Sequence, residues 1–148
     1  MNWQLLSFAE LSVDQLYELL KLRVNVFVVE QDCAYAELDE KDRHPQTMHL
    51  LAFEEEQLCG YARIIPPGVS YLQASIGRVA VAAEFRNKGV AKQLMLKSIE
   101  TTKAHWPTQG IQIGAQEYLS GFYQQLGFEA VSEVYLEDGI PHLDMRLN

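Results

Sequence analysis

The segment Arg86 to Ala91, RNKGVA, has the composition of an anion-binding turn. It lies between a strand-like stretch and an apolar-periodic stretch, so the backbone N–H groups of a first helical turn would point outward together. Gly89 lets a bulky phosphate approach the backbone, and Ala91 keeps the next position small. Arg86 and Lys88 add positive charge where the helix dipole favours an anion. The spacing matches neither GxxxxGK[ST] nor GxGxxG, and a glycine turn with solvated charges is the alternative interpretation.

The helices that must position this turn are indicated by apolar residues at helical spacing. Ser12 and Gln15 form a capping box at the start of the first apolar stripe. Pro107 and Gly110 close the helix that follows the RNKGVA turn, and Gly127 ends a short one. The predicted helices cover 11–31, as one long helix or two, and then 89–106 and 118–126.

Strand-like runs separate these helices. Asp138-Gly139 is a strong hairpin signal near the end of the chain, whereas the polar stretch 32–47 has the character of a loop. The predicted strands lie at 3–8, twice within 48–65, at 75–82, at 111–116 and twice within 128–148. The order β, α, β, β, β, α, β, α, β, β predicts an α+β fold, with a predominantly antiparallel sheet, a parallel crossover in its middle and helices on its faces.

Composition limits the function classes. A chain of 148 residues indicates a single domain over 1–148. Its net charge of −8 argues against a phosphate-backbone partner, so we expect no nucleic acid. The absence of a long apolar run or a basic, apolar leader predicts no membrane segment and a cytoplasmic protein. Cys33 and Cys59 lack CxxC spacing, which favours reduced thiols without a metal role.

Three segments together resemble the GCN5-related N-acetyltransferase (GNAT) superfamily. Arg86, Gly89 and Ala91 match its pyrophosphate signature, (Gln/Arg)-x-x-Gly-x-(Gly/Ala). The preceding IGRVAV is similar to the family's fourth strand, and GFYQQLGF to its carboxy-terminal motif, in which a tyrosine precedes Leu-Gly-Phe. More narrowly, RVNVFVVEQDCAYAELDEKDRH, HLLAF and AQEYL resemble the ElaA-like branch. The resemblance covers nearly the whole chain and implies the GNAT acyl-CoA N-acyltransferase fold, with a mixed central sheet flanked by helices.

The resemblance implies acetyl-coenzyme A as the co-substrate. Its pyrophosphate would lie on the turn formed by Arg86, Lys88, Gly89, Val90 and Ala91. Its pantetheine arm would pair like an added strand with the backbone of Val79 and Val81, beside a bulge that splays two parallel strands. A backbone N–H there would also stabilise the thioester oxyanion. Gln116 stands where many members carry asparagine, and we expect it to reach a water or the pantetheine amides.

An amine acceptor must lose a proton before it attacks. For a lysine-like amine with a pKa of about 10.4, this costs roughly 4 to 5 kcal/mol at pH 7. Candidate bases lie in and beside the first long loop, namely Glu30, Glu37, Asp39, Asp42 and His49. We predict Glu30 and His49 as catalytic and Glu37 as acceptor-binding.

The alternatives for these residues are structural. Each carboxylate of the loop could simply be a solvated surface group. Glu30 could merely end a helix, and His49 could be a hydrogen-bonded histidine at a strand start. Asp39, Asp42, His44 and His49 match no familiar metal-ligand spacing, so no metal is expected. Arg63 and Arg78, on strands, are either inward-facing substrate or ion-pair groups or exposed side chains, and we predict Arg78 as acceptor-binding.

Tyr123 is the candidate general acid. A phenol with an ordinary pKa of about 10 is protonated at neutral pH and can give its proton to the departing thiolate. The alternative is an aromatic core residue beside Phe122 and Phe128.

The resulting prediction is an N-acetyltransferase that acts on a small-molecule or peptide amine by direct attack in a ternary complex, without a covalent acyl-enzyme. Two rival functions stay open. One is a module that senses acetyl-coenzyme A without turnover, and the other is an acyltransferase related to acyl-homoserine-lactone synthases, which the segment VFVVEQ somewhat resembles. The sequence identifies no acceptor, and a monomer or a homodimer is equally compatible with it, although the carboxy-terminal hairpin could supply a dimer edge.

Overall fold

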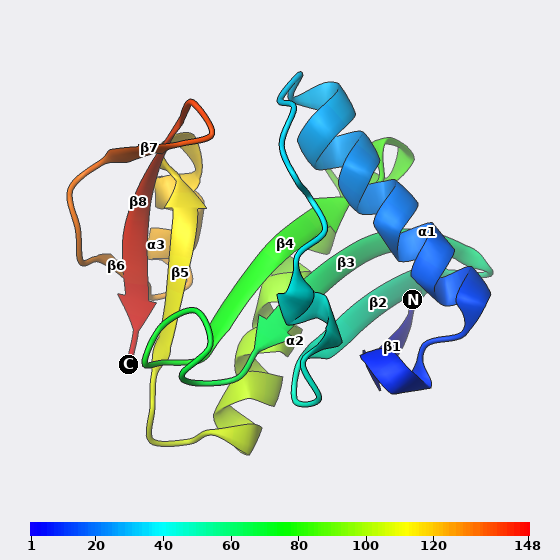
Figure 1. Ribbon diagram of the computed structural model, residues 1–148, viewed down its shortest axis with the longest axis horizontal. Coiled ribbons are helices and arrows are strands. Elements are labelled where there is room, and N and C mark those ends of the chain that lie inside the picture. The colour runs from blue at the N-terminus through cyan, green and yellow to red at the C-terminus, as the bar shows by residue number, and fades with distance from the viewer.

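The computed structural model describes residues 1–148 and contains two antiparallel sheets (Figure 1). The first sheet has the strand order β1-β2-β3-β4. Its strands are β1 (Asn2–Ser7), β2 (Met48–Glu54), β3 (Gln57–Ile65) and β4 (Ser75–Val81). Tight turns join neighbouring strands only between β2 and β3, and β4 forms one open edge of the sheet.

The second sheet is built around the last strand of the chain. Its path is β5-β8-β6, and β7 also pairs with β8. The strands are β5 (Ile111–Gln116), β6 (Glu129–Ala130), β7 (Tyr135–Glu137) and β8 (Ile140–Leu147). The predicted hairpin at Asp138-Gly139 is present, because Glu137 on β7 pairs with Ile140 on β8.

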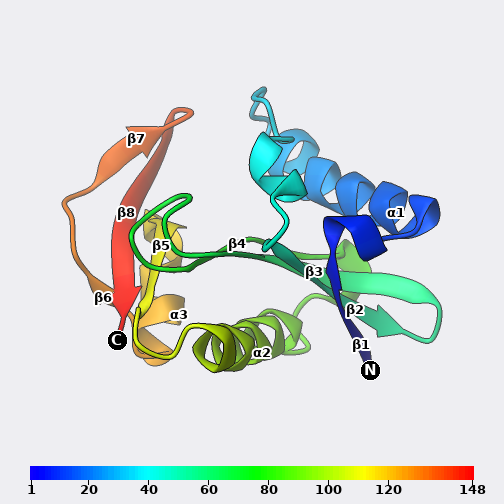
Figure 2. The same ribbon diagram turned by 60° about the horizontal axis from the view of Figure 1, so that its bottom comes forward.

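The two sheets touch through one parallel bridge, between Ala74 and Ile111. Beyond that bridge β4 and β5 diverge (Figure 2). The parallel pairing expected in the middle of one sheet is therefore reduced to a single contact, and the strands that leave it open a gap between the two sheets.

Helices cover both faces of the first sheet. Figure 2 shows α1 (Val13–Val24) and α2 (Val90–His105) on opposite faces, with α3 (Ser120–Gln125) beside β5 on the same side as α2. The predicted capping box starts α1, because Ser12 Oγ accepts from the Gln15 backbone N–H and the Gln15 side chain accepts from the Ser12 backbone. The helix continues into a π-helical segment, Asn25–Glu30. Short 3-10 turns complete the order at Phe8–Glu10, Glu40–Arg43, Ala83–Phe85 and Glu117–Leu119.

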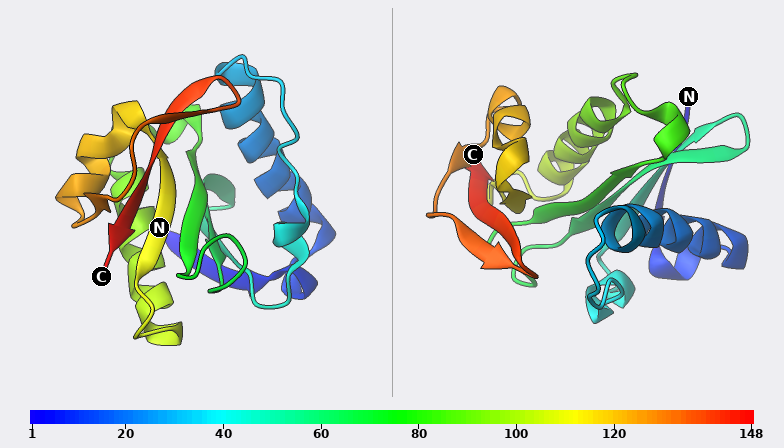
Figure 3. Two further views of the ribbon diagram at one scale, coloured as in Figure 1. Left: turned by 60° about the vertical axis from the view of Figure 1, so that its left-hand side comes forward. Right: turned by 90° about the horizontal axis from the view of Figure 1, so that it is seen from above.

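The core has two parts because alternate residues of the central strands face opposite sides. On β2, Leu50 and Ala52 face the α2 side, whereas Leu51 faces the α1 side. The larger cluster, which includes Met95 from α2 and Met145 from β8, spans both sheets. This shared core joins the two sheets. Figure 3 shows from the side and from above that α1 and α2 lie on opposite faces of the first sheet.

Candidate active site

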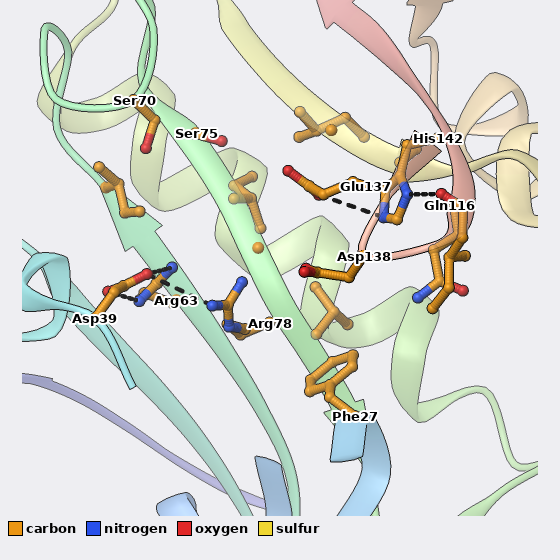
Figure 4. A pocket seen from close by; sticks show the side chains of 18 of the residues that line it. Phe27, Asp39, Arg63, Ser70, Ser75, Arg78, Gln116, Glu137, Asp138 and His142 are labelled. Atoms are coloured by element: carbon orange, nitrogen blue, oxygen red, sulfur yellow. Dashed lines mark hydrogen bonds and ion pairs between the residues drawn. The ribbon is translucent and has the colours of Figure 1, made fainter. Parts of the chain in front are cut away.

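A cleft of about 450 Å³ lies between β4 and β5 (Figure 4). One wall carries Arg63, Arg78 and the loop residue Asp39. The opposite wall carries Gln116 from β5 and side chains of the β7–β8 hairpin. Tyr123 lines the cleft from α3. The gap between the diverging strands is therefore a cavity of the size that small-molecule sites have, with polar groups on both sides among apolar ones.

A bulge in β4 lies beside this cleft. Tyr61 on β3 pairs with Ala80, but Arg63 pairs with Gly77, so β4 carries one extra residue. Arg78 has φ of 52°, in the left-handed region that favours glycine. A bulge bends its strand and increases the local twist, which contributes to the separation of β4 from β5.

The open edge of β4 presents backbone groups that no neighbouring strand pairs with. The Ala82 N–H donates to the Cys59 carbonyl on β3 at 2.9 Å. Residues of an antiparallel pair alternately face the partner and turn away from it. Ala80 therefore also faces β3, whereas Val79 and Val81 direct their backbone N–H and C=O groups away from it. Val79 lines the cleft, and Val81 is the last residue of β4.

The turn after β4 has the geometry of a helix-capping anion site. Gly89 is the N-cap of α2 with φ of 78°, and Asn87 before it has φ of 63°. Lys88 and Gly89 are exposed, and an added Cβ at Gly89 would meet no atom within 4 Å. The N–H groups of Val90 and Ala91 open the first turn of the helix, where no intrahelical acceptor exists.

Arg86 in this turn is paired with Glu30. Its Nη1 and Nη2 donate to the two carboxylate oxygens at 2.7 and 2.9 Å, and its Nε donates to the Val81 carbonyl at 3.2 Å. The hydrogen bonds from Arg86 hold the pKa of Glu30 below its ordinary value. Glu30 lies outside the residues that line the cleft. The pair ties the end of the π-helical segment to the turn that starts α2.

Glu37 belongs to a buried ion network behind the cleft wall. Its Oε2 accepts from Arg23 Nε at 2.6 Å and from Arg78 Nε at 2.8 Å, and its Oε1 accepts from the Tyr35 hydroxyl. The side chain is 2% exposed. Both oxygens are thus occupied, which conflicts with the expectation that Glu37 itself binds the acceptor.

Two aspartates extend the network. Asp42 accepts from Arg23 at 2.8 Å and from Arg63 at 3.0 Å, and Asp39 accepts from Arg63 at 2.7 Å. Burial alone would raise the pKa of each carboxyl, but the bonds and charges of the arginines outweigh it and hold both pKa values below their ordinary range. The loop that carries these acids is therefore anchored to α1, β3 and β4, and it fixes Arg78 at the bulge.

His49 lies in the core rather than in the cleft. It is 1% exposed, its Nδ1 lies 2.6 Å from the Tyr61 hydroxyl, and its Nε2 lies 3.0 Å from the Asp42 carbonyl. Burial holds the pKa of its imidazole below the ordinary value. Neither ring nitrogen is free to meet an amine, so this geometry contradicts the expected role of His49 as a catalytic base.

Tyr123 and Gln116 meet the cleft from the second sheet's side. The Tyr123 ring packs edge-on against Phe122 and Phe128, with centroid distances of 5.1 and 6.1 Å. Burial raises the pKa of Tyr123 to about 12, so its phenol stays protonated at neutral pH. Gln116 ends β5, and its side-chain nitrogen lies 3.4 Å from the Gln31 side-chain oxygen.

The β7–β8 hairpin brings Glu137 and His142 to the cleft wall, which sequence reasoning missed. His142 Nδ1 lies 2.7 Å from the Ile140 carbonyl, and its Nε2 lies 3.5 Å from a Glu137 oxygen. Both residues are labelled beside Gln116 in Figure 4. The hairpin signal at Asp138-Gly139 was available, but nothing in the sequence indicated that this hairpin faces the cleft.

No group of three or more His, Cys, Asp and Glu side chains is arranged to hold a metal ion. None of the helices has both the length and the apolar character needed to cross a bilayer.

Comparisons with known proteins give a consistent picture. A family model described as an acetyltransferase (GNAT) domain matches residues 13–148. The chain is 46% identical to protein ElaA of Escherichia coli (strain K12) over 144 residues, which cover 97% of this chain and 94% of that protein. The crystal structure of E. coli ElaA matches with a TM-score of 0.93 at 45% identity, covering 99% of each chain.

Two solved acyltransferases have related structures. An acyl-CoA N-acyltransferase from Pseudomonas aeruginosa matches with a TM-score of 0.94 at 40% identity, over 99% of each chain. An aminoglycoside 6'-N-acetyltransferase complexed with coenzyme A has a TM-score of 0.71 at 16% identity, over 99% of this chain and 96% of that one, which shows a shared fold alone.

Proposed function

The chain belongs to the acetyltransferase (GNAT) family of acyl-CoA N-acyltransferases, and on that premise we propose that it transfers the acetyl group of acetyl-coenzyme A to a primary amine. We propose direct attack in a ternary complex. The observation that carries the proposal is the cleft between β4 and β5, where an unpaired strand edge leads to a glycine turn at a helix N-terminus. A donor whose diphosphate is followed by an arm that carries amides fits that order of groups.

The donor would be held mainly by backbone. The N–H groups of Gly89, Val90 and Ala91, together with the dipole of α2 and the charge of Lys88, favour a diphosphate at the turn. Arg86 would contribute its charge there once it leaves Glu30. The outward N–H and C=O groups of Val79 and the outward N–H of Val81 would pair with the pantetheine amides in the way one strand pairs with another, whereas the Val81 carbonyl accepts from Arg86 Nε.

The chemical step would use two groups near the thioester. A backbone N–H at Val79 would stabilise the oxyanion that forms on the carbonyl, and such a donor contributes typically about 3 to 4 kcal/mol. Tyr123 would protonate the departing thiolate, a role supported by its place on the cleft wall and by its protonated phenol. Gln116 would contact the arm or a water beside it.

On the acceptor side, we propose that Arg78 binds an oxygen of the substrate. Its Nε and Nη2 donate to Glu37 and Asp39, whereas Nη1 makes no hydrogen bond within the protein. Glu37 would act through Arg78 as a positioning residue. Glu30 is paired with Arg86 outside the cleft, and His49 is in the core. The position of neither residue fits the role of general base.

Two rival functions make different demands on the same cleft. A sensor would bind acetyl-coenzyme A without turnover. A relative of acyl-homoserine-lactone synthases would prefer a long acyl donor.

A ping-pong route through a thiol would need an activated cysteine. Cys33 lines the cleft, and the one hydrogen bond of its Sγ within the protein is to the Asp138 carbonyl at 3.5 Å, so no side-chain base activates it.

The proposal is tested by following coenzyme A release with a panel of primary amines, using acetyl- and octanoyl-coenzyme A as donors. We expect turnover with at least one amine, an acetyl preference, intersecting double-reciprocal plots and a Cys33→Ser variant of wild-type rate. Donor binding without turnover would favour the sensor. A preference for octanoyl-coenzyme A would favour the relative of the lactone synthases. Parallel plots together with an inactive Cys33→Ser variant would favour a thiol intermediate.

A further inference from the structure

We propose that His142 is the general base that takes the proton from the acceptor ammonium, with Glu137 beside it to stabilise the resulting imidazolium. This inference rests on the proposed amine acetylation. It starts from the hairpin wall of the cleft, where His142 and Glu137 lie across from Arg63 and Arg78 (Figure 4).

The tautomer of His142 is fixed by its backbone partner. A carbonyl oxygen only accepts hydrogen bonds, so the contact of 2.7 Å between Nδ1 and the Ile140 carbonyl requires the hydrogen on Nδ1. In the neutral ring Nε2 then carries the lone pair. The nitrogen on the Glu137 side of the ring is thus the one that can accept a proton.

The strand register holds the ring in place. His142 pairs with Gln116 on β5 and with Tyr135 on β7. Directly paired residues project to the same face of a sheet, so the imidazole lies between these two side chains. The Tyr135 ring stacks on it at 6.1 Å with an angle of 22°, and Tyr135 donates to Asp144 at 2.6 Å. His142 is therefore next to the end of β5, where Gln116 and Tyr123 line the donor side of the cleft.

The other candidate bases are carboxylates that already form ion pairs with arginines. Asp39 is bound by Arg63, Glu37 by Arg23 and Arg78, and Glu30 by Arg86. A carboxylate held by arginine is a poor proton acceptor, because accepting a proton would break the ion pair. On the opposite wall Glu137 makes no ion pair with an arginine or a lysine, and its side chain is 60% exposed.

The proposed step is a single proton transfer. One N–H bond of the acceptor ammonium breaks, its electron pair stays on the amine nitrogen, and the proton bonds to the lone pair of Nε2. The products are a neutral amine, able to attack, and an imidazolium whose charge lies about 3.5 Å from the Glu137 carboxylate. The imidazolium then returns the proton to solvent through the open cleft mouth.

The titratable groups around the imidazole allow a clean pH test. Glu137 and Tyr135 on β7 contact the ring, and Tyr135 bonds Asp144 on β8. Asp138 in the hairpin turn and Tyr71 in the loop before β4 line the same cleft, and Arg63 and Arg78 line its opposite wall. Burial raises the pKa of Tyr71 to about 12, and burial with the Asp144 bond raises that of Tyr135. These phenols stay protonated between pH 5 and 9, so they cause no change of kcat/KM with pH in that range.

The test compares kcat/KM from pH 5 to 10 in the wild type and His142→Gln, with the best amine of the panel. We expect a loss of about 10² to 10⁴-fold at pH 7, which shrinks as the pH approaches the amine's own pKa and solvent supplies the free amine. His105→Gln is the matched control, because His105 also bonds a backbone carbonyl through Nδ1, at 3.0 Å, but lies outside the cleft. It should retain the wild-type profile.

A second variant keeps the test decisive if the His142→Gln substitution impairs folding. Glu137→Gln, at an exposed position, should lower kcat/KM at pH 7, because it removes the carboxylate that lies 3.5 Å from the ring nitrogen receiving the proton. A His142→Gln enzyme that binds acetyl-coenzyme A normally and loses no rate at pH 7, or a loss that is constant with pH, would overturn the proposal. So would a Glu137→Gln enzyme with the wild-type kcat/KM at pH 7. A wild type without any turnover would instead refute the amine acetylation on which the inference rests.

Discussion

Arg86 and Glu30 form an ion pair in which both terminal guanidinium nitrogens meet the carboxylate, at 2.7 and 2.9 Å. The turn proposed for the donor diphosphate therefore already holds an anion of the protein. A diphosphate that binds there must compete with Glu30 for Arg86 and tolerate its negative charge.

We therefore expect Glu30→Gln to tighten coenzyme A binding. An exposed ion pair is worth about 0.2 to 1 kcal/mol, so the gain is at most about fivefold in Kd. Calorimetry at low and high salt measures it, and the gain should shrink with salt. Glu84→Gln removes a nearby charge that bonds Gln57 instead of Arg86, and serves as the control. Weaker binding in Glu30→Gln would show that Glu30 positions Arg86 for the donor, and a large loss of kcat would restore it as a catalytic base.

Gly89→Ala should weaken donor binding more than it weakens folding. The left-handed φ of 78° costs an alanine about 1 to 2 kcal/mol, although no atom lies within 4 Å of the added Cβ. A bound diphosphate would occupy that open space. Gly68→Ala is a matched control, since Gly68 has φ of 85° and equally open surroundings. Equal stability losses with a raised coenzyme A Kd only in Gly89→Ala are expected, and an unchanged Kd would place the phosphate site elsewhere.

Tyr123→Phe should lower kcat by about 10² to 10⁴-fold with little change in donor Kd or melting temperature. The substitution keeps the ring between Phe122 and Phe128, and the hydroxyl makes no hydrogen bond within the protein whose loss would cost stability. Tyr118→Phe controls for loss of a hydroxyl at an exposed position, since Tyr118 is 75% exposed. A Tyr123→Phe enzyme of full kcat, under conditions where chemistry limits the rate, would mean that the thiolate leaves without this acid.

Much of the fold was readable because its signals are local. The capping box of Ser12 and Gln15 and the hairpin at Asp138-Gly139 each lie within four residues, and both form as predicted. The resemblance to the GNAT superfamily, its ElaA-like branch and the GNAT fold are confirmed by the family match and by the solved relatives.

The site was less predictable because its partners are far apart in sequence. Arg78 meets Glu37 across 41 positions and Arg86 meets Glu30 across 56. A single sequence shows which residues can carry charge but not which charges neutralise each other. The same limit explains His49, whose place on a strand start could not reveal that it faces Tyr61 in the core.

The buried His49 should leave a mark on stability. Burial holds its pKa below the ordinary value, so the unfolded chain takes up the proton first. The contribution of neutral His49 to the free energy of unfolding is fully present above the unfolded pKa of about 6.5, and it is lost as the pH falls from there toward the folded pKa. Urea unfolding from pH 8 to 5 should show this decline in the wild type and in the exposed control His105→Gln, but less of it in His49→Gln. Equal slopes in all three would contradict a neutral, buried His49.

The central claim is that the acyl donor lies in the gap between β4 and β5, and amide hydrogen exchange with and without acetyl-coenzyme A tests it most directly. Four N–H groups should exchange freely in the protein without donor and become protected when the donor binds. They are the outward N–H groups of Val79 and Val81 and those of Val90 and Ala91 at the start of α2. Amides of β2, already paired on both sides, should not change. Donor-dependent protection confined to segments other than β4 and the start of α2 would contradict the claim.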